Sequence, residues 1–202
     1  MANYLVTDTD LTSVADAIRT KGGTSAALEF PDGFVDAIDD IETGGGGDTL
    51  AEYGNGTLAT WHTTDLTSII SNGMRYNSNL KTIVAPNLTS IGTNAFGNAG
   101  LKTLDTAKLS SIANGAFVSC ASFTKLILRR SSVASLGNTS AFNSSPFASS
   151  GSGGTLYVPS AMIASYQSAT NWSTILGYAN NSIQAIEGSI YETEYADGTP
   201  IS

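Results

Sequence analysis

Three short sequence patterns recur in phase along residues 66–161, and this internal repetition restricts the fold more than any other feature of the chain. The first is a Leu-Thr-Ser-Ile pattern, with spacings of 22, 21 and 24 residues between its four occurrences. The second is a small residue followed by a bulky apolar residue, and the third is a strand-like tail that ends each unit. The first pattern begins at Leu66, Leu88, Leu109 and Val133, the second at Gly73, Ala95, Ala116 and Ala141, and the tails at Leu80, Leu101, Phe123 and Thr155.

A unit of this length cannot bury its own apolar residues, whereas stacked units place equivalent Leu, Ile and Phe side chains in columns that cover one another. The repetition therefore predicts an α+β chain built on a short β-rich solenoid of about four repeats. The small residues before Phe96, Phe117 and Phe142 let each turn lie close to the core. Cys120 falls on a core position, where a thiol acts as a small apolar group.

The segments that flank the repeats have the pattern of end caps, so we expect the solenoid with its caps to cover residues 49–187. Asn55-Gly56 between strand-like runs predicts a hairpin over 49–65. Ser160 is a candidate N-cap for a helix within a C-terminal cap at 162–187. The last stretch, 188–202, is expected to be an edge strand with a tail, since residues 190–195 alternate like an edge strand. The apolar residues expected in the C-terminal cap are Met162, Ile163, Tyr166, Trp172, Ile175 and Leu176.

The first 43 residues are expected to form two short amphipathic helices, one over 10–22 and one after Pro31. Such a segment buries little apolar area by itself, so it has the character of an attachment or assembly segment that docks on a carrier. Capping of the solenoid by the same segment is the alternative. A Gly-rich linker at 44–48 separates it from the repeats. Its candidate docking residues are Leu11, Val14, Ile18, Phe34, Val35 and Ile38.

Charge is spread unevenly, although the net charge is −8. Residues 1–48 and 166–202 are acidic, whereas 49–165 hold seven bases against three acids. An acidic chain without a dense basic stripe is a poor nucleic-acid ligand, so we expect no nucleic-acid partner. No apolar run is long enough to span a membrane. The first residues do not resemble a signal peptide, which predicts synthesis in the cytoplasm without one.

The pattern of titratable residues argues against an enzyme. His62 is the only histidine, and Asp65 three residues later is accompanied by no nucleophile motif, which favours a structural or surface role. Neither a zinc motif nor a complete calcium loop is present, so we expect no metal and no cofactor. The sequence predicts a non-enzyme.

Three lysines recur just before or within the strand-like tails, so stacked repeats should align them as a ladder on one face. Lys81, Lys102 and Lys125 form this expected ladder, and Arg129 and Arg130 extend it. Our hypothesis is that this face meets an anionic partner, either a cell-surface polymer or an acidic protein patch. The alternative is a solvated edge without a ligand.

The repeat residues resemble the BspA-like leucine-rich repeat, whose units run from a Leu-x-Ser-Ile motif through Ala-Phe to a Leu-rich strand. Residues 88–104 match that pattern closely, while Met74 and the longer fourth unit depart from it. Residues 11–38 resemble the opening of tail-fibre-like proteins of phages and prophages of Gram-positive bacteria. The resemblance implies a virion structural protein with an attachment segment and a binding solenoid.

From these observations we expect a non-enzymatic, phage tail-fibre or baseplate-associated protein on the virion tail or surface. Residues 1–43 would bind another tail or capsid protein, and the solenoid would bind a polymer or protein of the host-cell surface. Two alternatives stay open: a bacterial cell-surface adhesin, and an architectural decoration protein without a receptor. No heptad run long enough for a stable coiled coil is present, and the oligomeric state, a homo-oligomer included, is left open.

Overall fold

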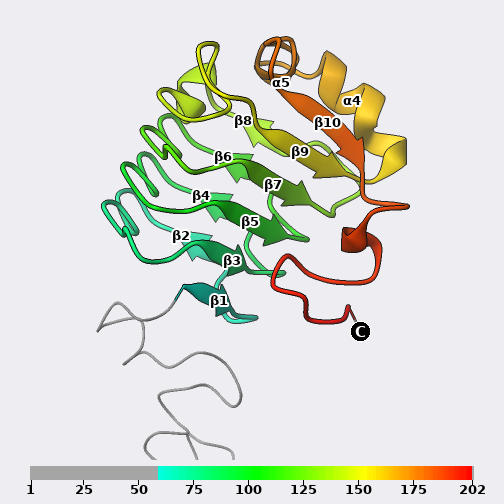
Figure 1. The fold of residues 1–202 in the computed structure, drawn as a ribbon, viewed down its shortest axis with the longest axis horizontal. Coiled ribbons are helices and arrows are strands. Elements are labelled where there is room, and N and C mark those ends of the chain that lie inside the picture. The colour runs from blue at the N-terminus through cyan, green and yellow to red at the C-terminus, as the bar shows by residue number, and fades with distance from the viewer. Residues whose placement is uncertain (1–58, 202) are drawn as a thin grey trace, which may run out of the picture. The chain divides into compact units, whose positions relative to one another are not determined.

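The structure is a computed structural model that describes residues 59–201, and in this range the chain winds through two parallel β-sheets (Figure 1). Neighbouring strands in each sheet come from successive turns of the solenoid. The six-stranded sheet contains β1 (Thr60–His62), β3 (Thr82–Val84), β5 (Thr103–Thr106), β7 (Lys125–Leu128), β9 (Thr155–Val158) and β10 (Ser182–Ala185). The four-stranded sheet contains β2 (Ser68–Ile69), β4 (Ser90–Ile91), β6 (Ser111–Ile112) and β8 (Ser135–Leu136).

This arrangement confirms the β-rich solenoid, since all four strand-like tails coincide with strands of the larger sheet. The smaller sheet is not predicted from the sequence; it is formed by the recurrent Leu-Thr-Ser-Ile pattern. In-register pairing places equivalent side chains in rows, and one row from each sheet faces the core between them. The residues of these two core rows are Ile83, Leu104, Leu126 and Leu156, and Ile69, Ile91, Ile112 and Leu136, all buried.

Phenylalanines fill the core under the turns that follow the smaller sheet. The ring of Phe117 lies 5.3 Å from Phe96, 5.4 Å from Phe142 and 4.3 Å from Phe123 between centroids, with all four rings nearly parallel. The alanine before each repeat phenylalanine is fully buried, as predicted. The turns themselves use residues with left-handed backbone, where asparagine is tolerated well. Examples are Asn72, Asn94 and Asn98.

Two short helices close the C-terminal end of the core, α4 (Ile163–Ser168) and α5 (Trp172–Leu176). They supply hydrogen-bond partners for the backbone of Ala134, which directly precedes β8. The N–H of Ala134 donates to the Tyr166 hydroxyl at 2.9 Å, and the Trp172 indole N–H donates to the Ala134 carbonyl at 2.7 Å. Both aromatic side chains are fully buried. These contacts occupy the edge at β8 and block further strand addition there.

Two details of the predicted ends are wrong. Ser160 is not the N-cap: it is the first residue of the 3-10 turn η2 (Ser160–Met162), and its N–H donates to Glu187 at 2.7 Å. The predicted edge strand at 190–195 is not found. The strand at the C-terminal edge of the larger sheet is β10, which lies inside the predicted cap. The stretch 190–195 instead contains the 3-10 turn η3 (Ile190–Glu192), because the Ser189 hydroxyl accepts the N–H of Tyr191 and starts a helical turn.

The predicted N-terminal hairpin over 49–65 is tested only in its last part. Thr60–His62 pairs with β3 in parallel, so this part belongs to the larger sheet of the solenoid. The rest of the hairpin, the two predicted helices and the linker at 44–48 lie outside the described residues. So do the candidate docking residues Leu11, Val14, Ile18, Phe34, Val35 and Ile38.

Candidate binding surface

The outer face of the six-stranded sheet carries two rows of side chains, which alternate along each strand with the rows that face the core. The first row is almost entirely hydroxyl-bearing, with one lysine. It contains Thr60, Thr82, Thr103, Lys125, Thr155 and Ser182. The second row is mixed and contains His62, Val84, Asp105, Ile127, Tyr157 and Gln184.

Residues 186–201, here called the C-terminal strap, cross the outer face along the second row (Figure 1). Near the last strands, Ile186 and Tyr191 pack against Ile127, and the Tyr191 ring meets Tyr157 edge-on at 4.7 Å. At the first strand, the Asp197 carboxylate lies 2.7 Å from His62 Nδ1. The strap thus covers most of the second row, while the first row remains beside it.

Arg129 is the central anchor of the strap. Its guanidinium forms a bidentate ion pair with Asp105, with 2.7 Å for both Nε–Oδ1 and Nη2–Oδ2, and also donates to the carbonyls of Tyr191 and Glu194. Asp105 is fully buried and accepts a third bond from the N–H of Ala196. Burial raises the pKa of Asp105, and the Arg129 guanidinium opposes that rise. Arg129 therefore holds the strap, which corrects its expected place among ligand-facing bases.

His62 holds the other end of the strap and has the structural role predicted for it. Its ring lies edge-on to Tyr195 at 5.2 Å, and its Nδ1 contacts both Asp197 and the Thr199 hydroxyl. The nearby Asp65 is not its partner. Burial works to raise the pKa of Asp197, but hydrogen bonds from Thr199 and His62 outweigh it and hold that pKa below its usual value.

We expect acid to release this end of the strap. Because the folded pKa of Asp197 lies below its ordinary value of 3.8, the ionised carboxylate stabilises the strap above pH 3.8. This stabilisation is lost as the pH falls through the lower, folded pKa. The ring resonances of Tyr195 in NMR spectra should report the release. In Asp197→Asn the Tyr195 resonances should lack this pH step, and an identical step in that variant would contradict the assignment.

The three lysines do not form one continuous ladder. Backbone bonds place Lys102 beside Lys81, but the next position in that row is Thr124, and Lys125 pairs with Thr103 in the following row. The expected ladder is wrong by one residue at its third member, because Lys125 is the third residue of its strand-like tail, whereas Lys81 and Lys102 are the second residues of theirs. Lys102 and Lys125 are exposed, while Lys81 is half-buried and donates to the Ser78 carbonyl.

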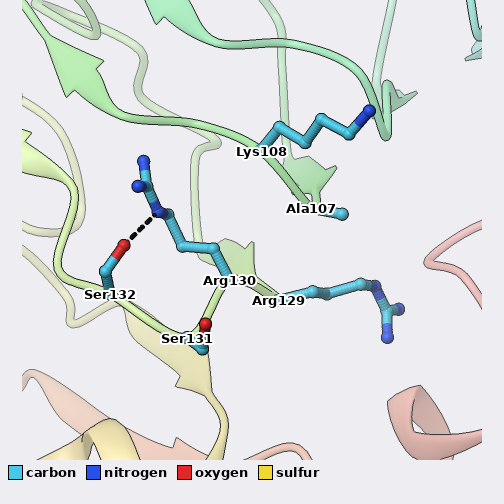
Figure 2. Close-up of a pocket in the computed structure, with 6 residues that line it drawn as sticks. All are labelled: Ala107, Lys108, Arg129, Arg130, Ser131 and Ser132. Carbon is cyan, nitrogen blue, oxygen red and sulfur yellow. Dashed lines mark hydrogen bonds between the residues drawn. The ribbon is translucent and has the colours of Figure 1, made fainter.

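An open pocket of about 430 Å³ lies where β5 and β7 end (Figure 2). Lys108 comes from the loop after β5, and Arg130 from the loop after β7. The Arg130 Nε donates to the Ser132 hydroxyl at 2.8 Å, and its Nη1 donates to the Leu109 carbonyl at 2.9 Å. Lys108 was not among the expected binding residues. It directly precedes the Leu-Ser-Ser-Ile pattern, and a charged residue at that point of the repeat was the available signal.

The single cysteine of the chain is a buried core residue. Cys120 is fully buried, its thiol donates to the Phe96 carbonyl at 2.7 Å, and burial raises its pKa to about 11, so the nucleophilic thiolate is disfavoured. In the same range no group of three or more His, Cys, Asp or Glu side chains is placed to hold a metal ion. None of the helices described there is long and apolar enough to cross a membrane.

Comparison with known proteins agrees with this geometry. No curated protein matches the chain. Residues 61–153 match the family described as "BspA type Leucine rich repeat region (6 copies)". Repeat regions of this family are typically non-enzymatic binding scaffolds, which indicates a binding or adhesion role. Over residues 61–153 the chain therefore contains a BspA-type leucine-rich repeat region.

Proposed function

We propose that the chain is a non-enzymatic virion protein of a phage tail fibre or baseplate, which docks on the particle through residues 1–43 and binds the host-cell surface through its solenoid. The observation that carries the binding role is the repeat-built surface itself. The first row of its outer face is polar and includes the exposed Lys125, and the exposed Lys102 directly precedes Thr103 of that row, which favours an anionic target. The virion context is supported by the resemblance of residues 11–38 to tail-fibre-like proteins.

The docking part of the proposal follows from the sequence of residues 1–43. Helical spacing would place Leu11, Val14 and Ile18 on one apolar face, which needs a cover. An acidic segment with such a face fits a pocket with an apolar floor and a basic rim on another tail or capsid protein. The glycine linker would then let the solenoid reach away from the particle.

Imaging of native particles tests this function. We expect antibodies against the solenoid to label the particle, with the label concentrated on the tail. Val14→Asp together with Ile18→Asp should remove the label, because two charges would be buried in the docking interface. The matched control is Thr12→Asp with Ser13→Asp, which adds the same charge outside the apolar face and should leave the label in place.

The alternatives predict different results. Label on the bacterial wall and none on particles would overturn the proposal in favour of a cell-surface adhesin. Label on particles combined with no adsorption of the purified chain to host cells would instead indicate an architectural decoration protein. Equal labelling in the aspartate variant and its control would contradict docking through residues 1–43.

A further inference from the structure

The pocket between the loops after β5 and β7 is lined by three basic side chains, two of which form no ion pair with a described residue. It is lined by Ala107, Lys108 and the four consecutive residues 129–132. Arg129 is turned away into the strap, where Asp105 neutralises it. Arg130 points to the other side and is fixed by two hydrogen bonds, to Ser132 and to the Leu109 carbonyl. Its guanidinium carries five N–H groups, so these two bonds leave donors free for a ligand.

The charge around this pocket is unbalanced. Among residues 59–201, the ion pairs of the carboxylates are Asp105 with Arg129 and Asp197 with His62, and neither Lys108 nor Arg130 pairs with an acid. Two other acids are engaged elsewhere, since Glu187 accepts from Ser160 and Glu192 accepts from Gly188. The pocket therefore presents two positive charges, of which the one on Arg130 is held in place before any ligand arrives. A guanidinium held in this way loses little freedom when it binds an oxyanion.

The placement of the two charges restricts the ligand. Figure 2 shows the Lys108 and Arg130 side chains leaving neighbouring loops in opposite directions, so that the charged groups stand at two sides of the pocket. Because the two charged groups point apart, one small anion is a poorer match for both than a longer ligand. A chain with anionic groups at intervals can contact both, and the serine hydroxyls of Ser131 and Ser132 between them suit a hydroxylated spacer.

We propose that this pocket binds an extended phosphodiester-linked polyol chain, with one phosphate at Arg130 and another at Lys108. This deepens the proposed function, on which it rests, by naming the chemical class of the target and the residues that meet it. Arginine favours phosphate through paired N–H donors, and lysine binds it as a point charge. Single-stranded nucleic acid is disfavoured, since the pocket lining contains no aromatic ring on which a base could stack.

Titration of the full chain with a short glycerol-phosphate oligomer tests the proposal, with inorganic phosphate and oligothymidylate as comparison probes. We expect the oligomer to bind, and inorganic phosphate to bind at least about tenfold more weakly, because it gains only one of the two charged contacts. Lys108→Ala and Arg130→Gln should each weaken oligomer binding about tenfold. Arg75→Gln is the matched control: it removes one exposed positive charge in the first repeat and should leave the affinity unchanged.

Several results would overturn the pocket assignment. They are equal loss in Arg75→Gln and Arg130→Gln, equal affinity for phosphate and oligomer, preference for oligothymidylate, or no binding of the oligomer by the intact chain. Measuring adsorption of the chain to host cells distinguishes a failure of the pocket assignment from a failure of the proposed function. If cells bind the double variant of Lys108 and Arg130 as well as the intact chain, the pocket is wrong while the host-binding role stands. If the intact chain does not adsorb although the oligomer binds, the host-binding role fails.

Discussion

Arg129→Ala is expected to lower the free energy of unfolding by about 3–5 kcal/mol, because it leaves the fully buried Asp105 carboxylate without its counter-charge. The same change removes the donor that holds the carbonyls of Tyr191 and Glu194, so the strap should detach from β5 and β7. Urea denaturation gives the stability, and hydrogen exchange of the strap amides gives the detachment.

Two further variants make this expectation specific. Arg75→Ala removes an exposed cation whose contact is the Tyr76 ring at 4.7 Å, and should cost less than about 1 kcal/mol. Asp105→Leu combined with Arg129→Met removes both charges, and should recover part of the loss since no unpaired charge stays buried. A cost for Arg129→Ala as small as that for Arg75→Ala would mean that the strap is not held by this ion pair.

Phe117→Ala is expected to cost about 3–5 kcal/mol, which is the usual range for emptying a fully buried phenylalanine site. Its ring contacts those of Phe96, Phe123 and Phe142, so the cavity would lie in the middle of the stack and neighbouring turns could not close it. Thermal or chemical unfolding monitored by circular dichroism measures the loss.

Met74 supplies the matched control for this substitution. It occupies the same repeat position in the first unit, where it is only half-buried. Met74→Ala should therefore cost less than half as much as Phe117→Ala. Similar losses of unfolding free energy at the two positions would show that the phenylalanine stack is not the main contributor to core stability. They would also show that the repeats contribute equally to the stability of the fold.

Local repetition made the centre of the fold predictable. In stacked repeats, each residue of a repeated pattern lies next to the equivalent residues of the repeats before and after it. The pairing of Leu104 with Ile83 and Leu126 is therefore implied by spacing alone. The burial of Ala95, Ala116 and Cys120 follows from the same phase. The two-residue strands of the smaller sheet were harder to foresee, because a segment as short as Ser90–Ile91 shows no alternation from which a strand could be inferred.

The strap and the charged groups were not predictable in the same way. Asp105 pairs with Arg129 one repeat away, but its other partner, Ala196, is 91 residues distant, and no periodic signal connects them. The alternation of 190–195 indicates a strand only if those backbone groups pair with a sheet edge; the Ser189 cap turns them into a 3-10 turn instead. The lysine ladder failed for a different reason: the one-residue shift at Lys125 is visible in the sequence, since Lys125 is third in its tail and Lys102 is second.

The course of the strap has a consequence for how the solenoid unfolds. In a linear repeat array each unit contacts only its neighbours, so the terminal units can fray independently of the rest. Here the segment that follows the last strand returns to the first, where Asp197 meets His62. It thereby links both ends of the array and contacts β5 and β7 on the way. Opening of the first repeat would break the contacts that hold this segment, so we expect the repeats to unfold in one cooperative transition.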